Sequence, residues 1–239
     1  MNTQSQFRSI RADRLLATME RLRDRVRERF PEANLGRVAE ELVDVGRESV
    51  ERSRQIRRPN LGLRILSIVL LVCGALALVG SVVALHPTLK TDWTWSDLVQ
   101  SFEALLGSLF FLGAGVVFIG KLDERRKRQR CLNAIHEMRA MAHIVDLHQL
   151  TKDPSEISER GPKTKSSPQR TMTPFELLRY LDYCSEMLSL IGKFAAIYVQ
   201  DFPDPQAMAA VDEVEDLTTS LSRKIWQKIM ILERGGVGE

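Results

Sequence analysis

Aromatic residues are scarce in this chain, and the pattern of a β-strand is missing from it. Phe, Trp and Tyr make up 6% of the 239 residues. No stretch shows the sustained alternation of apolar and polar residues that a half-buried strand needs. Gly and Pro gather in a few places and leave long stretches free for helices. The sequence therefore predicts an all-α protein.

Cysteines are few, and catalytic motifs are missing. Cys73, Cys131 and Cys184 lie far apart and form no CxxC pair, so they indicate neither a disulfide framework nor a zinc site. The sequence contains no phosphate-binding glycine loop with its lysine, no GxSxG and no HExxH. We therefore expect neither an enzyme nor a bound cofactor.

Charge is absent from two segments of a chain in which Asp, Glu, Lys and Arg make up 27% of the residues. Residues 65–85 carry no charge, and a helix of this length, at about 1.5 Å per residue, crosses about 30 Å of hydrocarbon. Residues 104–120 form a shorter uncharged run, which residues 98–102 extend if Glu103 reaches the outer interface. We predict an integral membrane protein with a two-helix hairpin, spans 65–85 and 98–120, within residues 61–121.

Lys and Arg are concentrated at the two outer ends of this hairpin, before the first span and after the second, and are rare in the loop that joins the spans. The six before the first span are Arg47, Arg52, Arg54, Arg57, Arg58 and Arg64, and the six after the second are Lys121, Arg125, Arg126, Lys127, Arg128 and Arg130. The loop at 86–97 has one, Lys90. Because short cytoplasmic flanks are enriched in Lys and Arg, we predict a multi-pass protein of the plasma (inner) membrane with both termini cytoplasmic. We assign the basic clusters to the lipid surface and expect no nucleic-acid partner, because no stacking aromatics accompany them.

The remaining segments predict cytoplasmic helices. Residues 1–60 read as two amphipathic helices interrupted at Pro31, whose narrow apolar stripes suit a helix pair or coiled-coil seam, or binding flat on lipid. Residues 122–152 continue the second span, and residues 153–172 form a linker rich in Ser, Lys and Pro. Residues 173–234 predict a long antiparallel helical hairpin, with Thr173 and Asp204 as the two helix caps and a heptad seam along its first helix.

Small and apolar residues at helical spacing mark the expected helix-packing positions. In the first span they are Cys73, Ala77 and Ser81, and in the later hairpin they are Leu181, Leu188 and Ile191. Small residues let helix backbones approach closely in a membrane. Packing within one hairpin and packing between protomers both remain open.

One group of polar residues invites a site hypothesis. His136, Arg139, His143 and Asp146 share a helix face, and we expect them to form a buried polar seam against neighbouring helices. A pH-sensitive network is one alternative, and a metal site is another. Only His143 and Asp146, three residues apart, are close enough to share an ion, because His136 and His143 lie about 10 Å apart along a helix. The expected seam makes His143 important for stability.

The function that these features favour is a membrane-anchored, self-associating helical scaffold or interaction protein that faces the cytoplasm. Its expected partners are the lipid bilayer, further copies of the chain and a cytoplasmic protein. The alternative is an oligomeric ion channel or pore-forming effector, in which Glu103 lies near the outer mouth and the cytoplasmic helices gate the pore. A simpler explanation for an acidic residue in this span is that the side chain of Glu103 reaches the lipid head groups.

Overall fold

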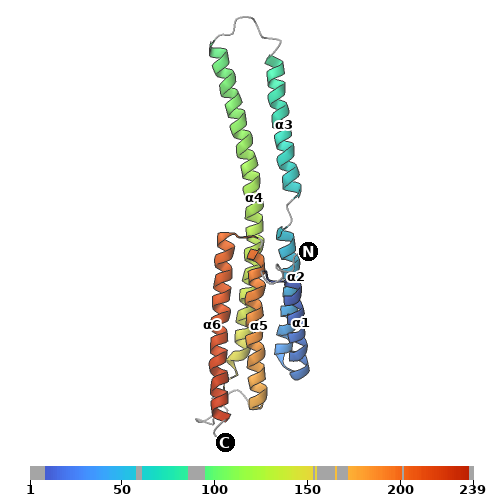
Figure 1. The fold of residues 1–239 in the computed structure, drawn as a ribbon, viewed down its shortest axis with the longest axis vertical. Coiled ribbons are helices and arrows are strands. Elements are labelled where there is room, and N and C mark those ends of the chain that lie inside the picture. Colours follow the sequence, from blue (N-terminus) through green and yellow to red (C-terminus); the bar gives the residue numbers. More distant parts are fainter. Residues whose placement is uncertain are drawn as a thin grey trace. The chain divides into compact units, whose positions relative to one another are not determined.

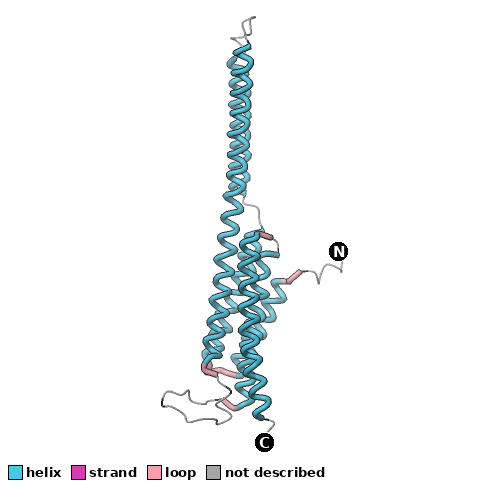
Figure 2. The backbone as a smooth tube through the Cα atoms, turned by 90° about the vertical axis from the view of Figure 1, so that its left-hand side faces the viewer, coloured by secondary structure: helices cyan, strands magenta, loops and turns pink. Residues whose placement is uncertain are grey.

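The computed structural model describes residues 9–57, 61–85, 95–152, 154, 165, 172–200 and 202–236. The helices are α1 (Ala12–Arg29), α2 (Asn34–Arg57), α3 (Leu61–Leu85), α4 (Trp95–Leu150), α5 (Pro174–Gln200) and α6 (Pro205–Gly236). Within the described residues there is no strand (Figure 2). The prediction of an all-α protein is confirmed for this part of the chain. Most of the predicted linker 153–172 and most of the predicted loop 86–97 lie outside it.

The chain divides into two compact units. One consists of Met1–Arg57 with Arg130–Glu239, and we call it the helical bundle. The other consists of Arg58–Gln129, and we call it the apolar helix pair. The helix α4 runs without a break through the boundary, so that residues 95–129 belong to the apolar helix pair and residues 130–150 to the helical bundle.

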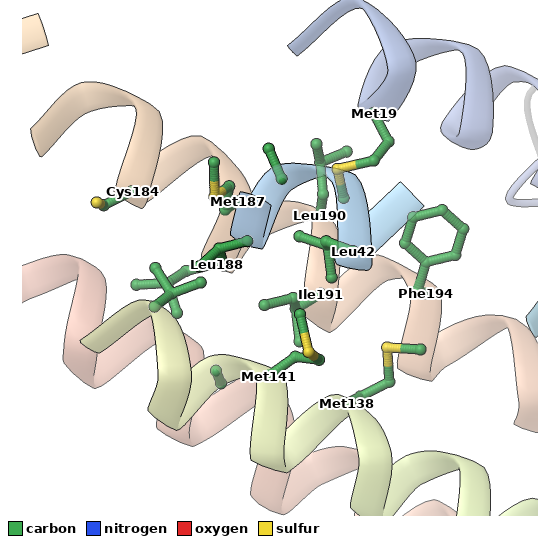
Figure 3. Close-up of a cluster of buried hydrophobic side chains, with 14 of the residues drawn as sticks. Met19, Leu42, Met138, Met141, Cys184, Met187, Leu188, Leu190, Ile191 and Phe194 are labelled. Atoms are coloured by element: carbon green, nitrogen blue, oxygen red, sulfur yellow. The ribbon is translucent and has the colours of Figure 1, made fainter. Parts of the chain in front are cut away.

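The helical bundle has one hydrophobic core, to which α1, α2, α5, α6 and the last part of α4 all contribute. Figure 3 shows Met19 of α1, Leu42 of α2, Met138 of α4 and Ile191 of α5 converging on the same space. All four side chains have no exposed surface. Burial of such side chains stabilises a fold by roughly 1.5–3 kcal/mol each. The apolar stripes of α1 and α2 therefore pack into this core and do not lie flat on lipid.

Helix α5 has neighbours around most of its circumference. Beside the predicted seam residues, which include Leu181, Leu188 and Ile191, it buries Tyr180, Tyr183, Met187, Leu190, Phe194 and Ile197. It packs against α6, and also against α1 and α2 (Figure 1). The seam is thus one side of a central bundle helix and not a two-stranded coiled coil.

The two helix caps of the α5–α6 pair are those that the sequence predicts. The backbone N–H of Thr173 donates to Glu176 Oε2 at 2.8 Å, and the N–H of Glu176 donates back to Thr173 Oγ1 at 3.2 Å. This reciprocal capping box also lowers the pKa of Glu176. Asp204 Oδ1 accepts from the N–H groups of Gln206 and Ala207, each at 3.1 Å. Helices α5 and α6 run antiparallel, as Figure 1 shows.

Candidate functional site

The apolar helix pair exposes large hydrophobic side chains along both of its helices. On α3 they include Leu61, Ile65, Ile68, Val72, Leu76 and Val79, and on α4 they include Phe102, Leu106, Phe110, Phe111, Val117 and Phe118. Both helices are long and apolar enough to cross a membrane, and almost nothing in their most apolar windows is buried inside the protein. A continuous apolar surface of this extent is unfavourable in water, so it marks a contact with lipid or protein.

Close approach of α3 and α4 occurs at two glycines. A Cβ atom at Gly74 would lie 2.6 Å from Cδ1 of Leu112, and one at Gly115 would lie 3.3 Å from Cδ2 of Leu70. Of the predicted packing residues in this span, Cys73 and Ala77 are exposed, and the side chain of Ser81 lies outside the described part. Within one chain, the packing position on α3 is therefore Gly74, next to the predicted Cys73.

The predicted polar seam is not buried. His136 and His143 are exposed, and so is Arg139, whose Nη1 lies 2.9 Å from Oε2 of Glu213 on α6. The side chain of Asp146 accepts a hydrogen bond from Nε2 of Gln149 at 2.6 Å and forms neither a hydrogen bond nor an ion pair with His143. The expectation that His143 is a buried partner in a polar seam is wrong, because that part of the helix surface faces solvent. Among the described residues, no group of three or more His, Cys, Asp or Glu could hold a metal ion.

A different polar cluster joins α4 to α6, and it was missed at the sequence level. Gln149 is only 1% exposed, and its side-chain and backbone oxygens both accept from Lys228 Nζ, at 2.7 and 2.8 Å. The carbonyl oxygen of Lys152 accepts from the same ammonium at 3.1 Å. Carbonyls at a helix end lack an intrahelical donor, and Lys228 supplies three N–H groups there. This cluster has a structural role as a helix cap.

A cleft of about 720 Å³ opens in the helical bundle between the α1–α2 turn, the end of α4 and the start of α5. The ring of Tyr180 forms part of its wall, with Lys152 Nζ 5.3 Å from the ring centroid. Its charged lining is mixed, because Arg29 and Lys152 are offset by Glu32 and Glu176. The cleft therefore favours neither sign of ligand charge.

The buried thiols of the bundle are not nucleophiles at neutral pH. Burial raises the pKa of Cys131 to about 11 and that of Cys184 to about 12. The thiolate is the reactive form of cysteine, and almost none of it exists near pH 7 at such values. Both side chains belong to the hydrophobic core.

Comparisons with known proteins give no relative for this chain. No family model, no curated protein and no solved structure matches it. The functional argument therefore rests on the chemistry of the two units.

Proposed function

We propose that this protein is a membrane-anchored helical scaffold that faces the cytoplasm and associates with further copies of itself. The observation that carries the proposal is the chemical contrast between the two units. The apolar helix pair exposes hydrophobic side chains along both helices, whereas the helical bundle buries most of its apolar residues in one core and has a largely charged surface. A lipid bilayer is the solvent that suits the first unit, and water suits the second.

The orientation of the protein in the membrane is proposed from the distribution of Lys and Arg along the chain. Six cations precede the first predicted span and six follow the second, whereas one lies between the spans; this asymmetry supports a cytoplasmic location for the helical bundle. We propose no catalytic role, since the buried thiols are protonated at neutral pH and the cleft has a mixed lining.

An exposed apolar face on α6 supports an interaction role for the bundle. Trp226 is 56% exposed and Met230, one turn further on, is 41% exposed. Their neighbours Arg223 and Lys224 are exposed and charged, as expected at the rim of a protein contact. Exposed Trp is uncommon on a free surface and is enriched at contact centres.

The test is the oligomeric state of the full-length protein in lipid nanodiscs or mild detergent, measured by multi-angle light scattering. We expect a defined oligomer for the wild type, and dissociation of the Trp226→Ser/Met230→Ser variant. A matched control, Leu147→Ser/Leu150→Ser, removes two other exposed apolar side chains of the bundle and leaves the oligomer intact. A strictly monomeric wild type would overturn self-association.

An oligomeric pore is the second candidate function. Glu103 of α4 is exposed in the single chain, and Gly107, Gly113 and Gly120 of the same helix have open space around them, which allows other helices to approach closely. Planar-bilayer recordings test this candidate. Conductance that changes in selectivity in Glu103→Gln supports a pore, whereas conductance equal to that of empty lipid counts against it.

A further inference from the structure

The segment that follows the apolar part of α4 is strongly basic and remains helical. The last uncharged residue is Gly120, and α4 continues through Lys121 to Arg130 without interruption. At a rise of about 1.5 Å per residue, Arg125 and Arg126 lie about 8 and 9 Å beyond Gly120 along the helix axis. The head-group layer on each side of a bilayer is about 5–8 Å thick, and a long arginine side chain reaches back toward it. Both arginines are thus within reach of lipid phosphates if α4 crosses the membrane.

Ion pairing within this segment leaves the two arginines unneutralised. Lys121 Nζ lies 3.1 Å from Glu124 Oε2, and Lys127 Nζ lies 3.0 Å from Asp123 Oδ2. These two carboxylates are the only acids between residues 121 and 130, and both are paired with lysines. Arg125 and Arg126 are exposed, and neither forms an ion pair with any described residue.

Arginine is well suited to phosphate. Its planar guanidinium donates two parallel hydrogen bonds to a phosphate and stays charged at all physiological pH values. Consecutive residues of a helix point about 100° apart, so the two side chains leave α4 in different directions and can contact separate head groups. The two arginines therefore form an open contact surface on the helix, and not an enclosed binding pocket.

We infer that Arg125 and Arg126 bind the phosphate groups of anionic phospholipids in the cytoplasmic leaflet. This inference rests on the proposed function, because it requires that α4 cross the membrane. It adds a lipid preference and assigns that preference to two residues. The lysines of the segment contribute less, since each has an acid partner within its own helix.

The experiment uses full-length protein in phosphatidylcholine bilayers with trace spin-labelled phosphatidylglycerol or phosphatidylcholine. The motionally restricted fraction of each probe gives the affinity of the protein for one lipid relative to the other. We expect the wild type to prefer phosphatidylglycerol by roughly two- to five-fold. The Arg125→Gln/Arg126→Gln variant should bring this ratio close to one, with an unchanged restricted fraction of phosphatidylcholine showing that it is folded and inserted.

A matched control removes the same charge elsewhere. Arg11→Gln/Arg14→Gln also replaces two exposed arginines, at the start of α1, and should keep the wild-type ratio. An unchanged ratio in the Arg125→Gln/Arg126→Gln variant, or an equal loss in the control, overturns the inference. A wild type that restricts both lipids equally also overturns it while leaving membrane insertion intact. The absence of any restricted lipid overturns insertion, and the proposed function with it.

Discussion

The ammonium group of Lys228 on α6 lies 2.8 Å from the backbone carbonyl oxygen of Gln149, in the last turn of α4. The two residues are separated by 79 positions in the chain. Their contact fixes the end of α4 against α6, where the only backbone donor to this carbonyl among the described residues is the N–H of Lys152, at 3.1 Å. The helical bundle is therefore held together by this polar contact as well as by its core.

Replacing Lys228 should destabilise the bundle. We expect Lys228→Met to lower the free energy of unfolding by on the order of 1–3 kcal/mol, because it leaves the buried side-chain oxygen of Gln149 without its donor. Thermal unfolding of the full-length protein in detergent measures the effect. Lys224→Met, at an exposed position four residues earlier, should change stability by less than about 0.5 kcal/mol. Equal effects of the two substitutions would show that the contact contributes little.

Replacing His143 should have almost no effect on stability. Its side chain is exposed, so we expect His143→Ala to change the free energy of unfolding by less than about 0.5 kcal/mol. Gln149→Ala, in contrast, removes the buried partner of Asp146 and Lys228 and should cost on the order of 1–3 kcal/mol. Chemical denaturation of both variants, each with and without a chelator, makes the comparison. A large loss in His143→Ala, or one that depends on the chelator, would restore the buried seam or the metal site.

Replacing Gly46 with alanine should destabilise the bundle. A Cβ atom there would lie 2.9 Å from Cζ of Phe194, whose side chain is fully buried in the core. Overpacking should outweigh the gain in helix propensity and give a net loss of about 1–2 kcal/mol in Gly46→Ala. The control is Gly36→Ala on the same helix, where the nearest atom is Cγ of Arg27 at an ordinary 3.5 Å. Differential scanning calorimetry should rank Gly46→Ala below the wild type and Gly36→Ala at or above it.

Stability of the bundle should fall at alkaline pH. Burial raises the pKa of Cys131 from 9.0 to about 11 and that of Cys184 from 9.0 to about 12, so the folded state favours the protonated thiols. Their contribution is fully present below pH 9 and is lost as the pH rises through the folded values. Unfolding free energies measured between pH 8 and 11 should therefore decline, and less steeply in Cys131→Ala/Cys184→Ala. Parallel curves for the variant and the wild type would exclude the thiols as the cause.

Labelling of single added cysteines should report the orientation of the chain. Lys90→Cys, in the predicted external loop outside the described residues, should react with an impermeant maleimide on intact cells. Glu28→Cys and Ser220→Cys are exposed positions of the bundle and should react only after permeabilisation. The wild type gives the background from its three native cysteines. Labelling of positions 28 and 220 from outside, with position 90 protected, would reverse the topology.

Helices can be predicted from this sequence because helix caps and apolar periodicity depend on residues that are close together in the chain. Thr173 and Glu176 sit three residues apart, and this spacing alone predicted the capping box that starts α5. The apolar residues Leu181, Leu188 and Ile191 were expected to be buried and are so, since helical periodicity already places them on one face. The burial around the rest of α5 could not be predicted, because it depends on α1 and α2, which are distant in sequence.

What the sequence determined by itself is therefore the all-helical class, the starts of α5 and α6 and the position of two uncharged segments, all of which follow from neighbouring residues. Only the tertiary structure decided which polar residues of α4 have partners. His143 and Gln149 both lie near the end of that helix, but α6 covers Gln149 with Lys228 and leaves His143 in solvent. The physical reason is that burial depends on which distant helix packs against each face, and helical periodicity specifies the face but not its neighbour.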